Sequence, residues 1–387
     1  MTSPAFASTS NNVASKLHVA IVGASLGGLS AANVLHRLGA KVDVFESFPA
    51  GFAKRGGALG SVDTELLREI RGGGRESVSA IRGHGHFYGD LWQFLYDGLP
   101  PERVHFGYDL MEILNVESSG GGEKDATPQL VFAPPNDKDF STVKFDLVIG
   151  ADGGRSTVRP YVTDETPKYA GYTVWRGFCP MEGIDGPPSG RKMVNGVHYE
   201  TLGFPVRGFD NTIMWNCGVY MAMPEEMVER PVKNRQVGAS AMKTVPEWFV
   251  PFTRECFGES TGKFWDECVR KGKVSPHAVW EMAADRVVNG RVVLLGDAAH
   301  MASPRTGAGA YTAMVDAVML GRAFAQSTDV EAALRIYNDD TVMRGKKLFA
   351  SSRRAASGFA PLSHSGRGQC EMAPEEVLQL LQKKSRG

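Results

Sequence analysis

The stretch Leu17-His-Val-Ala-Ile-Val-Gly-Ala-Ser-Leu-Gly-Gly-Leu29 constrains the fold of this chain more than any other feature. Val19 to Val22 form a continuous apolar run, which is typical of a buried parallel strand. A helical pattern over 30–38 stops at Gly39, and the apolar segment Val42 to Phe45 follows as a second strand. This order of strand, glycine turn, helix and strand predicts a Rossmann-like unit.

The turn itself has the residues that hold an ADP moiety. Gly23 and Gly28 occupy the outer positions of a G-x-G-x-x-G pattern, and Ser25 replaces the middle glycine. Glycines admit a pyrophosphate to the helix N-terminus, and Glu46 at the end of the second strand suits the ribose hydroxyls. Two alternatives stay open, because many glycine-rich turns bind nothing and Glu46 is also compatible with an ordinary solvated carboxylate.

A second motif lies more than 270 residues further along the chain. Val292-Val-Leu-Leu-Gly-Asp-Ala-Ala-His300 reads as a strand followed by a turn, and Pro304-Arg-Thr-Gly-Ala-Gly-Ala310 follows it. We expect this segment to close the far end of a longer cofactor, which favours FAD over NAD. Helix capping is the alternative role for Asp297.

The composition of the chain argues against several other classes of protein. The chain has 387 residues, zero formal net charge and no Lys/Arg block, which argues against a nucleic-acid surface. Its five cysteines are widely spaced without a C-x-x-C pair, so we expect no metal site and no disulfide framework, and a cytoplasmic protein. No apolar run is long enough to span a bilayer. Residues 1–16 are polar and are expected to be a disordered lead, not a secretory signal.

The pattern predicts two interleaved parts. The FAD-binding domain comprises 17–168 and returns over 286–360 with two long helices, from about Gly309 to Gln326 and from Val330 to about Ser357. A substrate domain over 169–285 is mostly antiparallel sheet, and a tail over 361–387 ends in a surface helix from Ala373 to Lys384. Further strands are expected over 104–114, 130–132 and 143–149.

A third motif, Phe145-Asp-Leu-Val-Ile-Gly-Ala-Asp-Gly-Gly-Arg-Ser-Thr-Val-Arg159, predicts a buried strand, a glycine turn and a helix beginning near Ser156. Alone, it is equally compatible with a tight capped connection. Together, the three motifs resemble the fingerprints of the group A flavoprotein monooxygenases. The resemblance implies the p-hydroxybenzoate hydroxylase fold, an α/β class with a Rossmann-like FAD-binding domain and an interleaved antiparallel-sheet substrate domain.

The resemblance also implies the cofactor contacts. Ser25, Leu26 and Gly27 would meet the pyrophosphate, and Glu46 the adenosine ribose. Asp152 and Arg155 belong to a segment that serves both FAD and NAD(P)H, and Asp297 would bind the ribityl chain. The complete expected set is Gly23, Ser25, Leu26, Gly27, Gly28, Glu46, Ser47, Arg55, Leu110, Asp152, Asp297, Gly307, Ala308, Gly309 and Ala310.

Candidates for substrate binding and catalysis come from the aromatic-rich strands and the last motif. The substrate candidates are Trp175, Arg176, His198, Tyr199, Trp215 and Tyr220, and strand alternation predicts that only half of them face the site. Catalytic candidates are Arg176, His300 and Pro304, although a structural role is favoured for His300. Arg176 could hold a phenolate-like oxygen or the flavin, or pair with a carboxylate on the outer face.

The reaction implied by the resemblance is hydroxylation of an electron-rich aromatic or N-heteroaromatic ring. NADH or NADPH would serve as transient electron donor, and O₂ would react through a flavin C4a-hydroperoxide. The protein would be a monomer or a homodimer. A flavin reductase and an FAD-binding remnant without hydroxylase activity are the alternatives, whereas a halogenase is disfavoured because the W-x-W-x-I-P segment is absent from the sequence.

The sequence departs from the family pattern in two places near the expected pocket. The segment between Arg55 and Leu91 is shorter than in relatives, which use this region for a hairpin that joins the substrate sheet. The arginine that commonly opens the next helix is missing, and Phe87-Tyr-Gly-Asp90 stands there. Both departures concern the substrate pocket and leave the FAD motifs unaffected.

Overall fold

The computed structural model describes residues 12–51, 57–60, 62–72, 85–116, 127–133, 141–180, 188–194, 197–207, 213–228, 245–357 and 374–385. Arg55 and residues 1–11 of the expected lead therefore lie outside the described residues. Within the described part of the chain, no helix has both the length and the apolar character needed to cross a bilayer.

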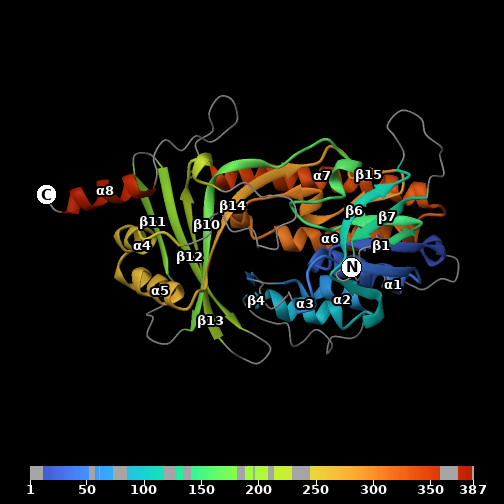
Figure 1. The fold of residues 1–387 in the computed structure, drawn as a ribbon, viewed down its shortest axis with the longest axis horizontal. Coiled ribbons are helices and arrows are strands. Elements are labelled where there is room, and N and C mark those ends of the chain that lie inside the picture. The colour runs from blue at the N-terminus through green and yellow to red at the C-terminus, as the bar shows by residue number, and fades with distance from the viewer. Residues whose placement is uncertain are drawn as a thin grey trace.

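The nucleotide-binding half is built on a six-stranded sheet with the order β15-β16-β9-β1-β2-β5 (Figure 1). Neighbouring strands are parallel except for β15 with β16. The chain order reverses at β1, and parallel sheets bind nucleotides beside such a reversal, at the carboxyl ends of the strands. The strands are β1 (His18–Val22), β2 (Lys41–Glu46), β5 (Val104–Phe106), β9 (Leu147–Gly150), β15 (Val288–Asn289) and β16 (Val292–Leu294).

Helices pack close to this sheet because glycine allows two of them to approach. A Cβ added to Gly27 would lie 3.2 Å from the Cβ of Ala313, so the first and sixth helices meet at this point. The helices predicted over 309–326 and 330–357 are confirmed to within one residue. The helices of this half are α1 (Leu26–Arg37), α2 (Thr64–Arg71), α3 (Tyr88–Tyr96), α6 (Gly309–Gln326) and α7 (Val330–Ala356).

A small antiparallel sheet adds to the same core. It consists of β6 (Asp109–Leu114), β7 (Gln129–Ala133) and β8 (Ser141–Lys144). Phe132 on β7 stacks on Phe45 of β2, with ring centroids 4.3 Å apart. The single strand predicted over 104–114 is wrong, because Gly107 turns the chain at φ +81° between β5 and β6.

The substrate half is an eight-stranded sheet with the order β17-β14-β10-β13-β12-β4-β3, and β11 pairs with β12. Its central strands are antiparallel, as predicted. The shortened region around 57–87 still contributes to this sheet, because it supplies its last two strands. The strands are β3 (Ala58–Leu59), β4 (His86–Phe87), β10 (Lys168–Pro180), β11 (Ser189–Val194), β12 (Val197–Arg207), β13 (Ile213–Ala222), β14 (Val274–Ala283) and β17 (His300–Met301).

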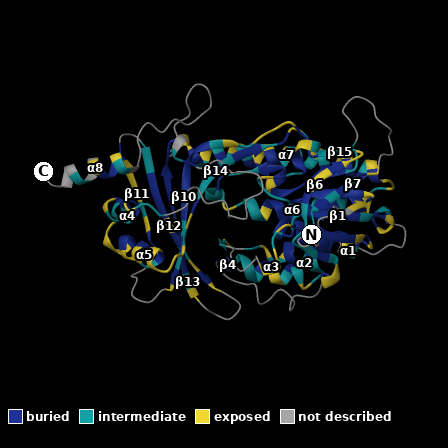
Figure 2. Ribbon diagram, viewed as in Figure 1, coloured by how far each residue is buried: buried dark blue, intermediate teal, exposed yellow. Residues whose placement is uncertain are grey.

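Three helices lie on the side of this sheet that points away from the nucleotide-binding half; the first two contact its strands, and the third packs against the first helix (Figure 1). They are α4 (Phe249–Phe257), α5 (Glu259–Arg270) and α8 (Pro374–Ser385). Their inner residues are buried with the sheet in one apolar cluster, which we call the outer core (Figure 2). The C-terminal helix is therefore more than a surface helix, since its Val377 and Leu378 belong to that cluster.

Two local predictions are corrected. Residues 13–16 of the expected lead form a 3-10 helix, capped by Asn12 and anchored by the fully buried Ala14. The helix expected near Ser156 is replaced by a single 3-10 turn, Arg159–Tyr161. Pro160 lies in the first turn, where its missing N–H is not needed.

Candidate functional site

The first glycine turn is shaped by contacts that only glycine permits. Gly23 has φ +103°, and a Cβ there would lie 2.4 Å from the carbonyl oxygen of Ala151. A Cβ on Gly28 would lie 1.9 Å from the oxygen of Gly23 itself. Helix α1 then begins at Leu26 without a hydrogen bond from the Ser25 side chain to its first turn. The N–H groups of that turn are thus suited to an anion such as a pyrophosphate.

The hydroxyl of Ser25 is held by a residue that sequence reasoning missed. Its Oγ lies 2.8 Å from the phenolic oxygen of Tyr88, the residue that opens α3. Burial raises the pKa of Tyr88 to about 12, so the phenol is neutral. Tyr88 stands in the segment where relatives were expected to carry an arginine. That departure was the only signal in the sequence that pointed to this position.

Glu46 is a buried carboxylate that braces the turn. Its two oxygens accept hydrogen bonds from the backbone N–H groups of Ala24 and Phe48, both at 2.9 Å, and Ser47 Oγ lies 3.3 Å away. Burial raises the pKa of Glu46 in spite of these bonds. The alternative of a solvated carboxylate is therefore wrong, whereas the ribose contact stays a prediction. Leu110, the predicted adenine neighbour, is buried in the core of the same half.

Asp152 combines a capping role with an unused acceptor. Its Oδ2 accepts from the backbone N–H of Thr157 at 2.6 Å and of Val158 at 3.2 Å. Its Oδ1 is buried without a hydrogen-bond partner among the described residues, and burial raises the pKa of the carboxyl. The capping interpretation is correct for one oxygen. Arg155, three residues further on, is exposed.

Arg159 joins the middle motif to the last one, and sequence reasoning did not single it out. Its buried guanidinium donates to the carbonyl oxygens of Gly153, Gly154, Asp297 and Ala298, at 2.8 to 3.2 Å. Burial lowers its pKa, which the nearby Asp152 and Asp297 oppose. A rigid fork of N–H donors suits such a set of carbonyls. This clamp holds two segments that are about 140 residues apart in the sequence.

The Asp297 carboxylate is free within the described structure. It follows the left-handed Gly296 in a 3-10 turn, its side chain is exposed, and none of the described residues donates a hydrogen bond to it. Enough protein surrounds the group that loss of hydration raises its pKa, although His300, Arg159 and Arg176 act in the opposite direction. Helix capping, the alternative for Asp297, is therefore wrong.

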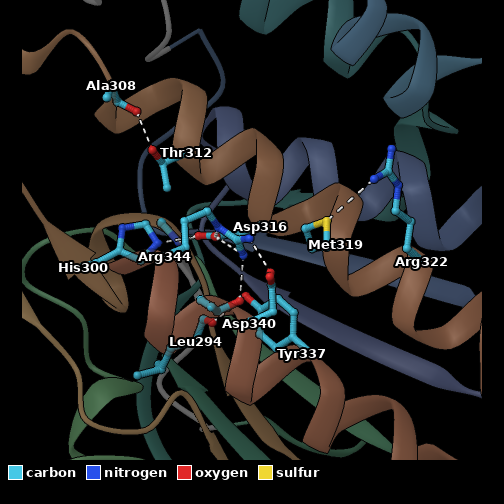
Figure 3. A network of polar contacts seen from close by, with 12 residues as sticks. Leu294, His300, Ala308, Thr312, Asp316, Met319, Arg322, Tyr337, Asp340 and Arg344 are labelled. Carbon is cyan, nitrogen blue, oxygen red and sulfur yellow. Dashed lines mark hydrogen bonds and ion pairs between the residues drawn. The ribbon is translucent and has the colours of Figure 1, made fainter. Parts of the chain in front are cut away.

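Behind this turn lies a buried charge network centred on Asp316 (Figure 3). One carboxylate oxygen accepts from the backbone N–H of Gly296 at 2.9 Å and meets His300 Nε2 at 2.7 Å, and the other oxygen is 3.1 Å from Arg344. Arg344 also contacts Asp340. The charge of Asp316 outweighs burial and raises the pKa of His300. His300 therefore has a structural role in this network, and Asp316 and Arg344 were missed.

The loop after His300 is anchored to two strands of the substrate half. Ser303 caps the 3-10 turn that begins at Pro304, and the Tyr172 hydroxyl on β10 bonds to Ser303 Oγ at 2.5 Å. Arg305 forms an ion pair with the buried Glu200 of β12. Gly307 adopts φ +63°, and α6 then begins at Gly309 without a side-chain cap. In the predicted segment, the N–H groups of Gly307 and Ala308 donate to Pro304 O and Thr306 Oγ1, whereas those of Gly309 and Ala310, in the first turn of α6, have no printed partner among the described residues and favour a partner with negative charge.

Three of the six substrate candidates are wrong, because they point into the outer core. Trp175 is fully buried and stacks on Phe249 of α4, with centroids 4.3 Å apart. Tyr199 packs against Phe252, and Trp215 belongs to the same cluster. These aromatic side chains hold helices on the sheet and do not face the nucleotide-binding half.

Strand alternation places Arg176, His198 and Tyr220 on the opposite face, which we call the inner face. Arg176 is half-buried and has no carboxylate within 4 Å in the described part of the chain. Burial lowers its pKa, while Tyr220 and Asp297 oppose that shift. A Cβ on Gly57 would lie 3.8 Å from the Arg176 guanidinium. The outer-face pairing considered for Arg176 is therefore wrong, and the cation lies between the two halves.

A match to a family model shows the family to which the chain belongs. A family model described as "FAD binding domain" matches residues 102–352. The chain belongs to the FAD binding domain family. The match covers the middle and last motifs, all strands of the substrate sheet except β3 and β4, and most of α7.

Curated relatives with known activities match most of the chain. The 2,6-dihydroxypyridine 3-monooxygenase of Paenarthrobacter nicotinovorans is 28% identical over 90% of this chain and 92% of its own length. An FAD-dependent urate hydroxylase of Klebsiella pneumoniae subsp. pneumoniae is 26% identical over 86% and 88%. The serine-containing glycine turn, Tyr169 to Gly177 and Gly296-Asp-Ala-Ala predict the likeness to the dihydroxypyridine enzyme, and it is confirmed.

Solved structures confirm the fold. The 2,6-dihydroxypyridine-3-hydroxylase from Arthrobacter nicotinovorans superposes with a TM-score of 0.67 at 24% identity, covering 92% of this chain and 95% of that one. Klebsiella pneumoniae HpxO complexed with FAD and uric acid gives 0.65 at 21% identity, over 94% and 92%. The predicted p-hydroxybenzoate hydroxylase fold is thereby confirmed, and the match to the FAD binding domain confirms the predicted FAD cofactor.

Proposed function

We propose that the protein is an FAD-dependent monooxygenase that hydroxylates an electron-rich aromatic or N-heteroaromatic ring, with NADH or NADPH as electron donor and O₂ as co-substrate. One observation carries the proposal. Arg176 projects from the inner face without a carboxylate partner in the described structure, within electrostatic range of the Asp297 turn. A half-buried cation without a carboxylate partner favours a ligand with negative charge as its complement.

The residues of the turn motifs fit FAD. Ser25 to Gly28 would hold the pyrophosphate at the N-terminus of α1, Glu46 the ribose, and Asp297 the ribityl hydroxyls. The uncapped start of α6 would face the flavin ring, where its N–H groups stabilise negative charge. When bound, FAD supplies the redox chemistry, accepting a hydride from NAD(P)H and activating O₂.

The side chains of the protein would bind and orient the substrate ring and exclude water from it. Arg176 would hold an anionic oxygen of the substrate ring, which orients the ring and keeps it electron-rich. The loop at Pro304, fixed by the Ser303–Tyr172 and Arg305–Glu200 contacts, would separate the ring from bulk water. The exposed apolar side chains of Met193 and Leu202 lie on the same inner face and offer surface for an aromatic ligand.

We also propose that the protein is cytoplasmic and acts as a monomer or a homodimer. The four cysteines in the described residues are free thiols, which suits a reducing compartment.

Anaerobic stopped-flow reduction tests the proposed function. FAD-loaded protein is mixed with NADH or NADPH, with and without a set of hydroxylated pyridines and phenols, and the loss of flavin absorbance is followed. We expect at least one ring to accelerate reduction and, in air, to yield a hydroxylated product. Rapid reduction without any hydroxylated product would instead identify a flavin reductase. A yellow protein that no nicotinamide reduces would identify a cofactor-binding remnant.

A further inference from the structure

Asn216 is a buried polar residue on the inner face of the sheet. Its neighbours Trp215 and Cys217 point into the outer core, so alternation along β13 directs Asn216 to the inner face. Its exposed fraction is 8%, and its side-chain oxygen has no hydrogen-bond partner within the described structure. An amide oxygen in this situation is costly to keep, because it has lost its water without a replacement.

The surroundings of Asn216 are aromatic. Its partners in the sheet register are Phe178 on β10 and Phe204 on β12. Phe87 of β4 lies against Phe178, with ring centroids 5.9 Å apart. The unpaired oxygen is therefore the polar feature of a wall made of phenyl rings. Such a wall binds a flat ring through its faces and leaves specificity to the few polar atoms present.

Arg176 is close enough to act on the same ring. In the register, Arg176 is opposite Gly218, and Asn216 is two residues from that glycine on the same face of β13. Diagonal neighbours of this kind have Cβ atoms roughly 7–8 Å apart. Gly218 has no side chain of its own, and the ring of Tyr220 lies against it, 3.4 Å from the position of a Cβ there. The donor group of Arg176 and the amide of Asn216 are thus diagonal neighbours on one face of the sheet.

We propose that Asn216 is a specificity-determining residue whose amide oxygen accepts a hydrogen bond from a ring N–H, while Arg176 holds an oxygen of the same ring. The substrate class is then hydroxylated N-heteroaromatic rings that carry an anionic oxygen and a ring N–H together. This inference rests on the proposed monooxygenase function and narrows its substrate.

The chemistry of the two groups explains why a simple phenolate fits less well. A guanidinium only donates hydrogen bonds, so the ring atom at Arg176 must be an acceptor. The phenolate of a monohydroxylated benzene has only C–H groups left for Asn216, and the amide oxygen would stay unpaired. A lactam-type ring supplies both an oxygen acceptor and an N–H donor. A site built around a hydrogen bond rejects analogues that lack it much more strongly than an apolar pocket rejects a size change.

Two variants separate ligand recognition from packing. Asn216→Leu removes the acceptor and keeps the number and branching of the side-chain heavy atoms. Trp215→Phe is the matched control, since Trp215 is the preceding residue, its buried Nε1 also lacks a partner in the described structure, and its side chain faces the outer core. Both changes remove a buried unpaired polar atom (Asn216→Leu removes the amide nitrogen as well), but only Asn216 faces the proposed ring.

The probes are 2,6-dihydroxypyridine and resorcinol, which carry the same two ring oxygens and differ in one ring atom, nitrogen against carbon. Binding to the FAD-loaded protein is measured from changes in flavin absorbance, without NAD(P)H. We expect the wild type to prefer the pyridine, and Asn216→Leu to weaken pyridine binding about 10- to 100-fold while leaving resorcinol nearly unchanged. Trp215→Phe should keep the wild-type preference.

A second readout needs no ligand. Asn216→Leu should raise the melting temperature of the FAD-loaded, ligand-free protein by roughly 2 °C, because an unpaired buried acceptor is removed. Equal losses on both rings, or no loss on either, would overturn the ring N–H assignment, as would a wild type that binds neither ring. Failure of the proposed function is distinguishable, since it appears as a protein that fails to bind FAD or is not reduced by NAD(P)H.

Discussion

The imidazole of His300 and the carboxylate of Asp316 form a hydrogen bond of 2.7 Å directly behind the Gly296–Asp297 turn, with both side chains almost fully buried. The same Asp316 oxygen accepts the backbone N–H of Gly296. The carboxylate therefore supports the position of the turn that the cofactor would use. Arg344, on the other side, balances its charge (Figure 3).

We predict that Asp316→Ala destabilises the protein by about 3–5 kcal/mol, because it leaves the charged form of His300 buried without its partner and removes one of the two carboxylates at Arg344, which keeps Asp340. FAD retention should fall as well, since Gly296 loses its anchor. Urea unfolding measures the first effect and FAD release on dilution the second. The matched control is Asp339→Ala on α7, which removes an exposed carboxylate and should change stability by less than about 0.5 kcal/mol.

The same pair predicts a pH dependence. Burial lowers the pKa of His300, but the charge and hydrogen bond of Asp316 raise it further, so the net shift is upward. The stabilisation from the protonated imidazole is fully present below the unfolded pKa of about 6.5 and is lost as the pH rises through the folded value. The stability difference between wild type and His300→Gln should therefore shrink from about pH 6 to about pH 9. A difference that grows with pH would contradict the upward shift.

Asp297→Ala should weaken FAD binding without unfolding the protein. The carboxylate accepts no hydrogen bond from the described residues, so its removal breaks no internal contact. The lost charge-assisted bond to a ribityl hydroxyl is worth about 1.5–3 kcal/mol, or one to two decades in Kd. FAD fluorescence titration of the apoprotein measures the change. Unaltered affinity would place the ribityl chain elsewhere.

The sequence predicted the elements that depend on local signals. The β1–α1–β2 unit, the start of α6 at Gly309 and the bounds of α7 follow from glycines, apolar runs and helical periodicity. The face to which each substrate-sheet aromatic points was not predictable. Both faces of β10 are largely buried, so its odd-numbered and even-numbered residues are both mostly apolar or aromatic. Alternation alone therefore does not indicate which of the two sets faces the outer helices.

Polar contacts between residues far apart in the sequence were also not predictable. Arg159 donates hydrogen bonds to backbone carbonyl groups about 140 residues away. Every residue has a backbone carbonyl, so the sequence does not indicate which of them accept these bonds. Asp316 and Arg344 lie on different helices outside any motif, so their pairing appears only when α6 and α7 are packed. Tyr88 had a weak signal, the missing arginine, but the sequence did not indicate that its partner is Ser25.

The opposite orientations of Trp175 and Arg176 give the sharpest test of the site. Trp175→Ala empties part of the outer core and should cost about 3–5 kcal/mol of stability, as large aromatic truncations do. Because its side chain faces α4, product formed per NAD(P)H consumed should stay near the wild-type ratio in the folded protein.

Arg176→Ala should give the reverse result. The guanidinium has no carboxylate partner in the described structure, so its loss should leave stability within about 0.5 kcal/mol of the wild type or raise it slightly. Without the cation, the ring is no longer held at the inner face, and NAD(P)H oxidation should proceed with little hydroxylated product. Arg176→Lys keeps the charge but loses the planar fork of donors, so partial coupling is expected. If Arg176→Ala keeps both coupling and substrate affinity, the ring is bound on another part of the sheet.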